Sequence, residues 1–96
     1  MTTIILNNTE FELVSFNRNT SFYENNISST ANCDIRVSNA AALQELINTT
    51  ITTLKIKYEN AVIYNLTDIS AKIVNMNEYL NTDHISTNLG LTFDLN

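Results

Sequence analysis

The 96-residue chain contains no proline, no tryptophan, one glycine and one cysteine. The lack of proline and glycine excludes the collagen-like, proline-rich and glycine/serine-linker classes of protein. The single cysteine, Cys33, cannot form an intramolecular disulfide, and it excludes a zinc site built from cysteines. Since the length is close to that of one average domain, we expect a single domain over residues 1–96.

Charged side chains are also scarce, at 16% of the chain. Five Lys and Arg against ten Asp and Glu give a formal net charge of −5. The cations are scattered, and only Lys55 and Lys57 lie close together in the sequence. Because contacts to phosphate need clustered Lys and Arg, we expect no direct nucleic-acid binding.

Long hydrophobic runs are absent as well, since no stretch of 18 apolar residues occurs. We therefore expect no transmembrane helix and no membrane partner. The first six residues lack the basic segment and the long apolar stretch of a secretory signal. The predicted location is the cytoplasm of the producing cell, or a virion if the protein is structural.

Amides and hydroxyls supply the polarity that charges do not. The chain holds 16 Asn, 13 Thr and 7 Ser, together 36 of 96 residues, beside 44% hydrophobic residues. This Asn/Thr/Ile-rich composition is typical of AT-rich coding DNA, as in bacteriophages and their low-GC hosts.

Apolar and polar residues alternate with the period of a β-strand over most of the chain. The longest alternation runs to the C-terminus and places on one face Ile85, Thr87, Leu89, Leu91, Phe93 and Leu95. Similar or weaker patterns predict strands over 3–6, 10–16, 31–38, 53–58, 61–66 and 69–74. The strand over 53–58 is expected to face inward with Leu54, Ile56 and Tyr58. In 10–16 the apolar residues occupy both faces, which indicates either burial on both sides or a β-bulge.

Two short segments between these strands are predicted hairpin turns, Asn7-Asn8-Thr9 and Glu59-Asn60, because asparagine tolerates a positive φ. One helix is predicted over 39–48, capped by Ser38 or Asn39. Its apolar stripe consists of Leu43, Leu46 and Ile47. A helix this short must pack on a sheet to be stable.

A second, shorter helical turn is predicted over 77–80. The fold class is therefore mainly β (α+β). We expect an antiparallel β-sandwich or partly open barrel of about seven or eight strands, with one short helix.

No combination of residues points to catalysis. His84 is the sole histidine, and its neighbour Asp83 is expected to point to the opposite side of a strand. Cys33 occupies an inward position, where a cysteine behaves as a small hydrophobic residue. We therefore predict a protein that is not an enzyme and that binds no metal or cofactor.

Residues 17–30 are the least regular part of the chain, and we expect a long loop or a projecting hairpin there. This segment contains the adjacent aromatic pair Phe22-Tyr23, and exposed aromatics are typical anchors of protein interfaces. The alternative is a hairpin that folds Phe22 onto its own core. The predicted interface residues are Arg18, Phe22, Tyr23, Ile27, Lys55, Lys57 and Tyr79.

The order of strands around one helix, the absence of proline and the Asn/Thr/Ile-rich composition resemble small tail and baseplate proteins of tailed phages. The resemblance extends over the whole chain as architecture and assigns a role to no individual residue. It implies a non-catalytic assembly subunit that binds copies of itself, or other virion or host proteins, through extended loops. The alternative is a small acidic phage inhibitor of a host defence protein, as some anti-CRISPR proteins are. A generic ligand-binding barrel ranks third.

Overall fold

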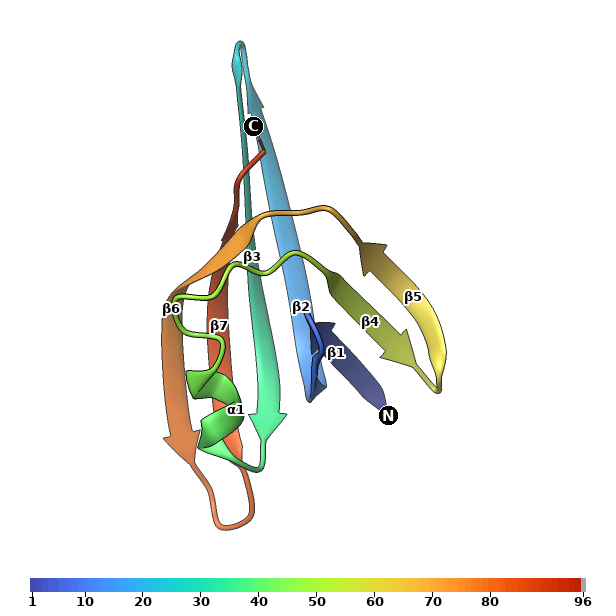
Figure 1. Cartoon of the computed structure of the whole chain (residues 1–96), viewed down its shortest axis with the longest axis vertical. Coiled ribbons are helices and arrows are strands. Elements are labelled where there is room, and N and C mark those ends of the chain that lie inside the picture. Colours follow the sequence, from blue (N-terminus) through green and yellow to red (C-terminus); the bar gives the residue numbers. More distant parts are fainter. Residues whose placement is uncertain (96) are drawn as a thin grey trace.

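The computed structural model describes residues 1–95, which form one seven-stranded antiparallel sheet with a short helix against one face (Figure 1). Neighbouring strands follow the order β5-β4-β1-β2-β3-β7-β6, so that β5 and β6 are the two edges and the sheet is not closed into a barrel. The mainly-β prediction is confirmed. The elements are β1 (Thr2–Leu6), β2 (Thr9–Tyr23), β3 (Asn26–Val37), α1 (Ala40–Gln44), β4 (Leu54–Tyr58), β5 (Ala61–Leu66), β6 (Ala71–Leu80) and β7 (Ile85–Phe93).

Both predicted hairpin turns are present. Asn7 has φ 58°, and Glu59 and Asn60 have φ 51° and 71°. The Asn7 side chain also accepts a hydrogen bond from the Thr52 backbone N–H at 2.8 Å. The β1–β2 turn is thereby attached to the segment that leads into β4.

The hydrophobic core lies between one face of the sheet and a cover formed by α1 and the segment that follows it. The predicted strand over 85–95 supplies Leu89 and Leu91 to this core, each at most 1% exposed. From the cover come Leu43, Leu46 and Ile51, all of which are buried. As predicted, the helix is capped by Asn39, whose side-chain oxygen accepts from the Ala41 N–H at 2.9 Å.

Three positions predicted to face inward do not. Ile47 is 42% exposed because α1 ends at Gln44, so that Ile47 lies in an irregular turn after the helix. Tyr58 is 54% exposed because it is the last residue of β4. Leu95, at 45% exposed, comes after the end of β7.

The predicted helical turn over 77–80 is wrong. These residues belong to β6, which pairs with β7 as far as Leu80 opposite Ile85. The alternation along β6 is interrupted at Val74, where the register with β7 shifts by one residue. The bulge breaks the period-2 pattern, so the sequence alone does not indicate a strand over 77–80. These residues are extended because they pair with β7.

A second bulge accounts for the mixed pattern in 10–16. The register between β2 and β3 shifts between Leu13 and Ser15, and Val14 is the extra residue. Beyond the bulge, Phe16 and the alternate residues that follow it face the core side. The bulge therefore determines which side chains of β2 share a face with the core.

Residues 17–30 form the projecting hairpin rather than a loop. β2 loses its neighbour β1 after Glu12, which lies opposite Thr3. β3 loses its neighbour β7 beyond Ser29, which lies opposite Phe93. The two strands continue past the rest of the sheet as a ribbon, whose tip marks one end of a molecule 48 Å long (Figure 1).

Candidate protein-binding surface

Three large apolar side chains are exposed at the tip of the β2–β3 hairpin. Phe22 is 75% exposed, Tyr23 72% and Ile27 54%. Phe22 and Ile27 are directly opposite each other across the two strands, so they share one face of the ribbon. Phe22 is therefore not folded onto the core, and the tip presents an aromatic and aliphatic cluster to solvent.

The base of the hairpin is held to the body of the protein by Arg18. Its Nε donates to Ser29 Oγ at 2.8 Å, and its Nη1 donates to the Tyr64 hydroxyl at 3.2 Å. The guanidinium carbon lies 4.5 Å from the centre of the Phe93 ring, a cation–π distance. Arg18 thus connects β2 to β3, β5 and β7.

Two further contacts reinforce this attachment. The rings of Phe16 and Tyr64 pack with their centres 5.5 Å apart. The hydroxyls of Thr20 and Ser29 are 3.1 Å apart, within hydrogen-bond distance across the strands. Strands fixed in this way hold the tip in a defined direction, which lowers the entropic cost of binding a partner.

The other predicted interface residues lie elsewhere. Lys55 and Lys57 are half-buried on β4 and pair with Ile5 and Thr3 of β1. Tyr79 is 71% exposed near the end of β6, the opposite edge of the sheet from β5. The structure therefore does not combine them with the hairpin tip into one surface.

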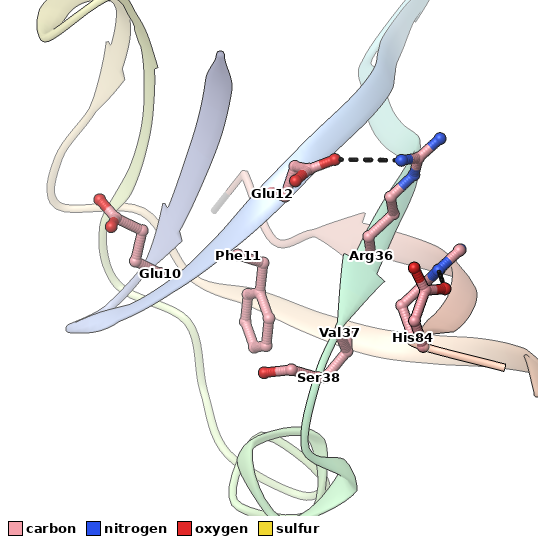
Figure 2. Close-up of a pocket in the computed structure, with 8 residues that line it drawn as sticks. Glu10, Phe11, Glu12, Arg36, Val37, Ser38 and His84 are labelled. Carbon is pink, nitrogen blue, oxygen red and sulfur yellow. Dashed lines mark hydrogen bonds and ion pairs between the residues drawn. The ribbon is translucent and has the colours of Figure 1, made fainter. Parts of the chain in front are cut away.

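A hollow of about 390 Å³ lies at the other end of the β2–β3 ladder from the hairpin tip, and it is lined by residues of β2, β3 and the turn before β7 (Figure 2). Its charged groups interact with one another, since Arg36 Nη1 is 3.6 Å from Glu12 Oε2. The carboxylates of Glu10 and Asp83 and the imidazole of His84 also line it. It is an open surface depression that is also lined by Phe11, Val37 and Ser38.

The turn before β7 corrects the expectation for His84. Asp83 precedes the strand, so its carboxylate reaches His84 Nδ1 at 2.7 Å instead of pointing away. His84 Nε2 is 3.2 Å from Ser86 Oγ, and Asn81 Nδ2 donates to that oxygen at 2.9 Å. The order of groups matches a hydrolase triad.

This turn nevertheless lacks the surroundings that a triad uses. The Asp83 side chain is 82% exposed, whereas the carboxylate of a triad is buried against its histidine. The hydrogen bond from His84 lowers the pKa of the Asp83 carboxyl. We interpret Asn81, Asp83, His84 and Ser86 as a hydrogen-bonded network that closes the β6–β7 turn.

The fold also shifts the pKa values of two other side chains, Cys33 and Asp34. Burial raises the pKa of the Cys33 thiol to about 12, which keeps it protonated and unreactive. Hydrogen bonds from Asn88 and Ser15, both 2.8 Å, lower the pKa of the exposed Asp34 carboxyl. Over residues 1–95, no group of three or more His, Cys, Asp or Glu side chains is arranged to hold a metal ion.

The sequence analysis missed one feature of this surface, the unpaired edge of β2. β1 is much shorter than β2, so the part of β2 beyond Glu12 has β3 as its only strand neighbour in the described chain. The two segments that flank Asn7-Asn8 have unequal lengths, and this difference could have predicted the unpaired edge of β2. The irregular pattern after Phe16 made the length of the second segment hard to recognise.

None of the helices in the described residues 1–95 is long and apolar enough to span a membrane. Comparison of the chain with family models, curated proteins and solved structures gives no match.

Proposed function

We propose that this chain is a non-catalytic assembly subunit of a tailed-phage type of particle and that it binds a protein partner through the tip of the β2–β3 hairpin. The observation that carries the proposal is the cluster of Phe22, Tyr23 and Ile27, exposed on a projection that is fixed at its base. The composition and strand order described above supply the phage context.

The physical argument concerns apolar surface. Covering a side chain such as Phe or Ile contributes about 1.5–3 kcal/mol when its burial is complete. Among residues 1–95 no strand runs beside the tip, because β1 and β7 both end before it. Aromatic residues gathered at one point also form the usual centre of a protein interface.

The tip carries little charge, which bears on the kind of partner. Between Asn19 and Ser29 the only charged residue is Glu24. A surface of this kind matches an apolar patch on a protein, and it gives no attachment for nucleic-acid phosphates.

The alternative function, inhibition of a host defence protein by occupying its nucleic-acid groove, would require a row of free carboxylates. Several carboxylates of this chain have partners of their own. Glu12 lies near Arg36, Asp34 accepts from Ser15 and Asn88, and Glu59 binds the N-terminal amine at 2.7 Å. The assembly function is therefore the better supported of the two.

Site-specific photo-cross-linking in the producing cell tests the proposal. A photoreactive phenylalanine analogue replaces Tyr23 at the tip or, as the matched control, Glu45, which is also exposed but lies just after α1. Mass spectrometry then identifies the adducts. We expect adducts with structural proteins of a particle, or with the chain itself, from position 23 and none from position 45.

Two results would contradict the assembly function. Adducts of position 23 with a nuclease or another defence protein would support the inhibitor. The absence of any adduct from position 23, with the chain folded and expressed, would show that the tip is not an interface.

A further inference from the structure

Besides the short stretch of β3 before Ser29, the sheet formed by residues 1–95 has three free edges, and they differ in how well they are protected from pairing with another strand. Natural sheets protect their edges with charged residues and bulges. β6 has both, namely Lys72, Glu78 and the bulge at Val74. β5 has no charged residue, but the register shift opposite Ile56 and Lys57 falls within its six residues.

The third free edge, on β2, is long and regular. Its bulge lies at Val14, and the nine residues Ser15–Tyr23 then pair with β3 without a further shift. At the usual rise of a strand they extend over about 30 Å. Arg18 is their only charged residue, and its side chain is turned toward Phe93 and Tyr64.

We propose that this edge pairs with the same edge of a second copy of the chain, antiparallel and around a two-fold axis near Thr20. The inference rests on the proposed function, and it identifies the first partner of the hairpin as the chain itself. The product is a dimer in which two hairpins form one four-stranded sheet, β3-β2-β2-β3.

The arrangement follows from self-complementarity. A two-fold interface requires one surface patch that fits itself, and an antiparallel strand edge does so. Pairing centred on Thr20 places Arg18 opposite Phe22 of the second copy, on the face that the cluster of Phe22 and Ile27 also occupies. The side of Phe22 that faces the free edge thereby gains a neighbour that it lacks among residues 1–95 of its own chain.

The exposed area suits a partner of this kind. Each aromatic side chain of the tip can bury about 150–250 Å². In the paired arrangement Phe22, Tyr23 and the strand edge would contribute a large part of the roughly 800 Å² per partner of a standard interface. The short free edge of β3 beyond Ser29 has too few residues for this, since β3 begins at Asn26.

Mass measurement across a concentration series, by size-exclusion chromatography with light scattering, tests the dimer on the full chain. We expect a discrete species of twice 10.8 kDa. Because each copy has a net charge of −5, raising the salt concentration is expected to strengthen the dimer by screening the repulsion. Hydrogen exchange at high concentration should show new protection within Asn17–Tyr23, the part of β2 that a two-fold axis at Thr20 pairs with itself.

A matched pair of variants locates the contact. Asn19 and Thr30 are cross-strand partners and both exposed, but Asn19 is on the free edge whereas Thr30 is flanked by Thr92 of β7. Asn19→Lys places two like charges on one face across the proposed axis and should weaken the dimer at least about tenfold. Thr30→Lys should leave its dissociation constant unchanged.

The outcomes separate this inference from the proposed function. A chain that stays monomeric at all concentrations overturns the dimer, and the proposed function then stands or falls on the adducts of position 23. A dimer that tolerates Asn19→Lys, or that shows no new protection on β2, places the contact elsewhere. Rings or open ladders of copies would overturn the two-fold arrangement in favour of a head-to-tail one.

Discussion

The two halves of the β2–β3 ladder share the same strands, yet they differ in how deeply their apolar side chains are buried. The lower half lies beside β1 and β7, and the upper half is the part that projects beyond them. In the lower half, Leu13, Cys33 and Ile35 are at most 9% exposed. In the upper half, Phe22 and Ile27 occupy equivalent alternate positions and are more than half exposed. The difference arises from the neighbours, since β1, β7 and the cover over the core reach only the lower half.

The comparison teaches that one pattern can serve two purposes. Where a second layer covers it, the alternation stabilises the fold. Where the strands outgrow that layer, the same alternation exposes apolar side chains for a partner. Mutations in the two halves should therefore affect different measurements.

The largest effect on stability is expected in the covered half of the sheet. Leu91 is 1% exposed and belongs to the core beside Leu89 and Leu43. Leu91→Ala should lower the free energy of unfolding by about 2–5 kcal/mol, because it leaves a cavity in addition to the lost burial. A urea titration measures this, and an unchanged midpoint would mean that β7 does not pack as described.

The exposed half should respond in the opposite way. Replacing both Phe22 and Tyr23 with Ala should weaken association by at least about 2 kcal/mol, as expected for interface anchors. The melting temperature of the monomer should hardly change, because both side chains are more than 70% exposed. A large fall in melting temperature with unaltered association would reverse this assignment.

Cys33 provides a test in the covered half that depends on pH. Its folded pKa of about 12 lies above the ordinary value of 9.0, so the folded state holds the proton that the unfolded chain releases. The stability from this group is complete below about pH 9 and is lost as the pH rises toward 12. The expected slope is about 1.4 kcal/mol per pH unit. Urea titrations at several alkaline pH values should show this slope, and Cys33→Ala should lack it.

The smallest effect is expected at the β6–β7 turn, which is far from the hairpin tip. His84→Asn removes the hydrogen bond that lowers the pKa of Asp83, so this pKa should rise toward its ordinary value. An NMR titration of the carboxyl carbon measures the change. Association and cross-linking at position 23 should remain unaltered, and their loss would revive a chemical role for the turn.

Much of the fold was predictable from local patterns. Alternation identified the strands that contain Leu89, Leu91, Ile35 and Ile56, and asparagine identified the turns at Asn7 and at Glu59-Asn60. These features depend on the period of the side chains and on the φ angles that single residues tolerate. Both are properties of a few adjacent residues.

The prediction was weaker where an element depends on its neighbours. Bulges at Val14 and Val74 shifted the alternation, so 10–16 was ambiguous and 77–80 was assigned to a helix. The hydrogen bond between Asp83 and His84 was missed because the position of the turn relative to β7 was unknown.

The sequence by itself determined the class of the fold, the turns and the aromatic pair Phe22-Tyr23, and it narrowed the helix cap to Ser38 or Asn39. Only the tertiary structure decided that this pair stands on a ribbon, that Arg18 holds its base, and that one edge of β2 has no neighbour. The physical reason is that burial and edge pairing are properties of the strands alongside. Those strands lie far away in the sequence, and their lengths decide where the cover ends.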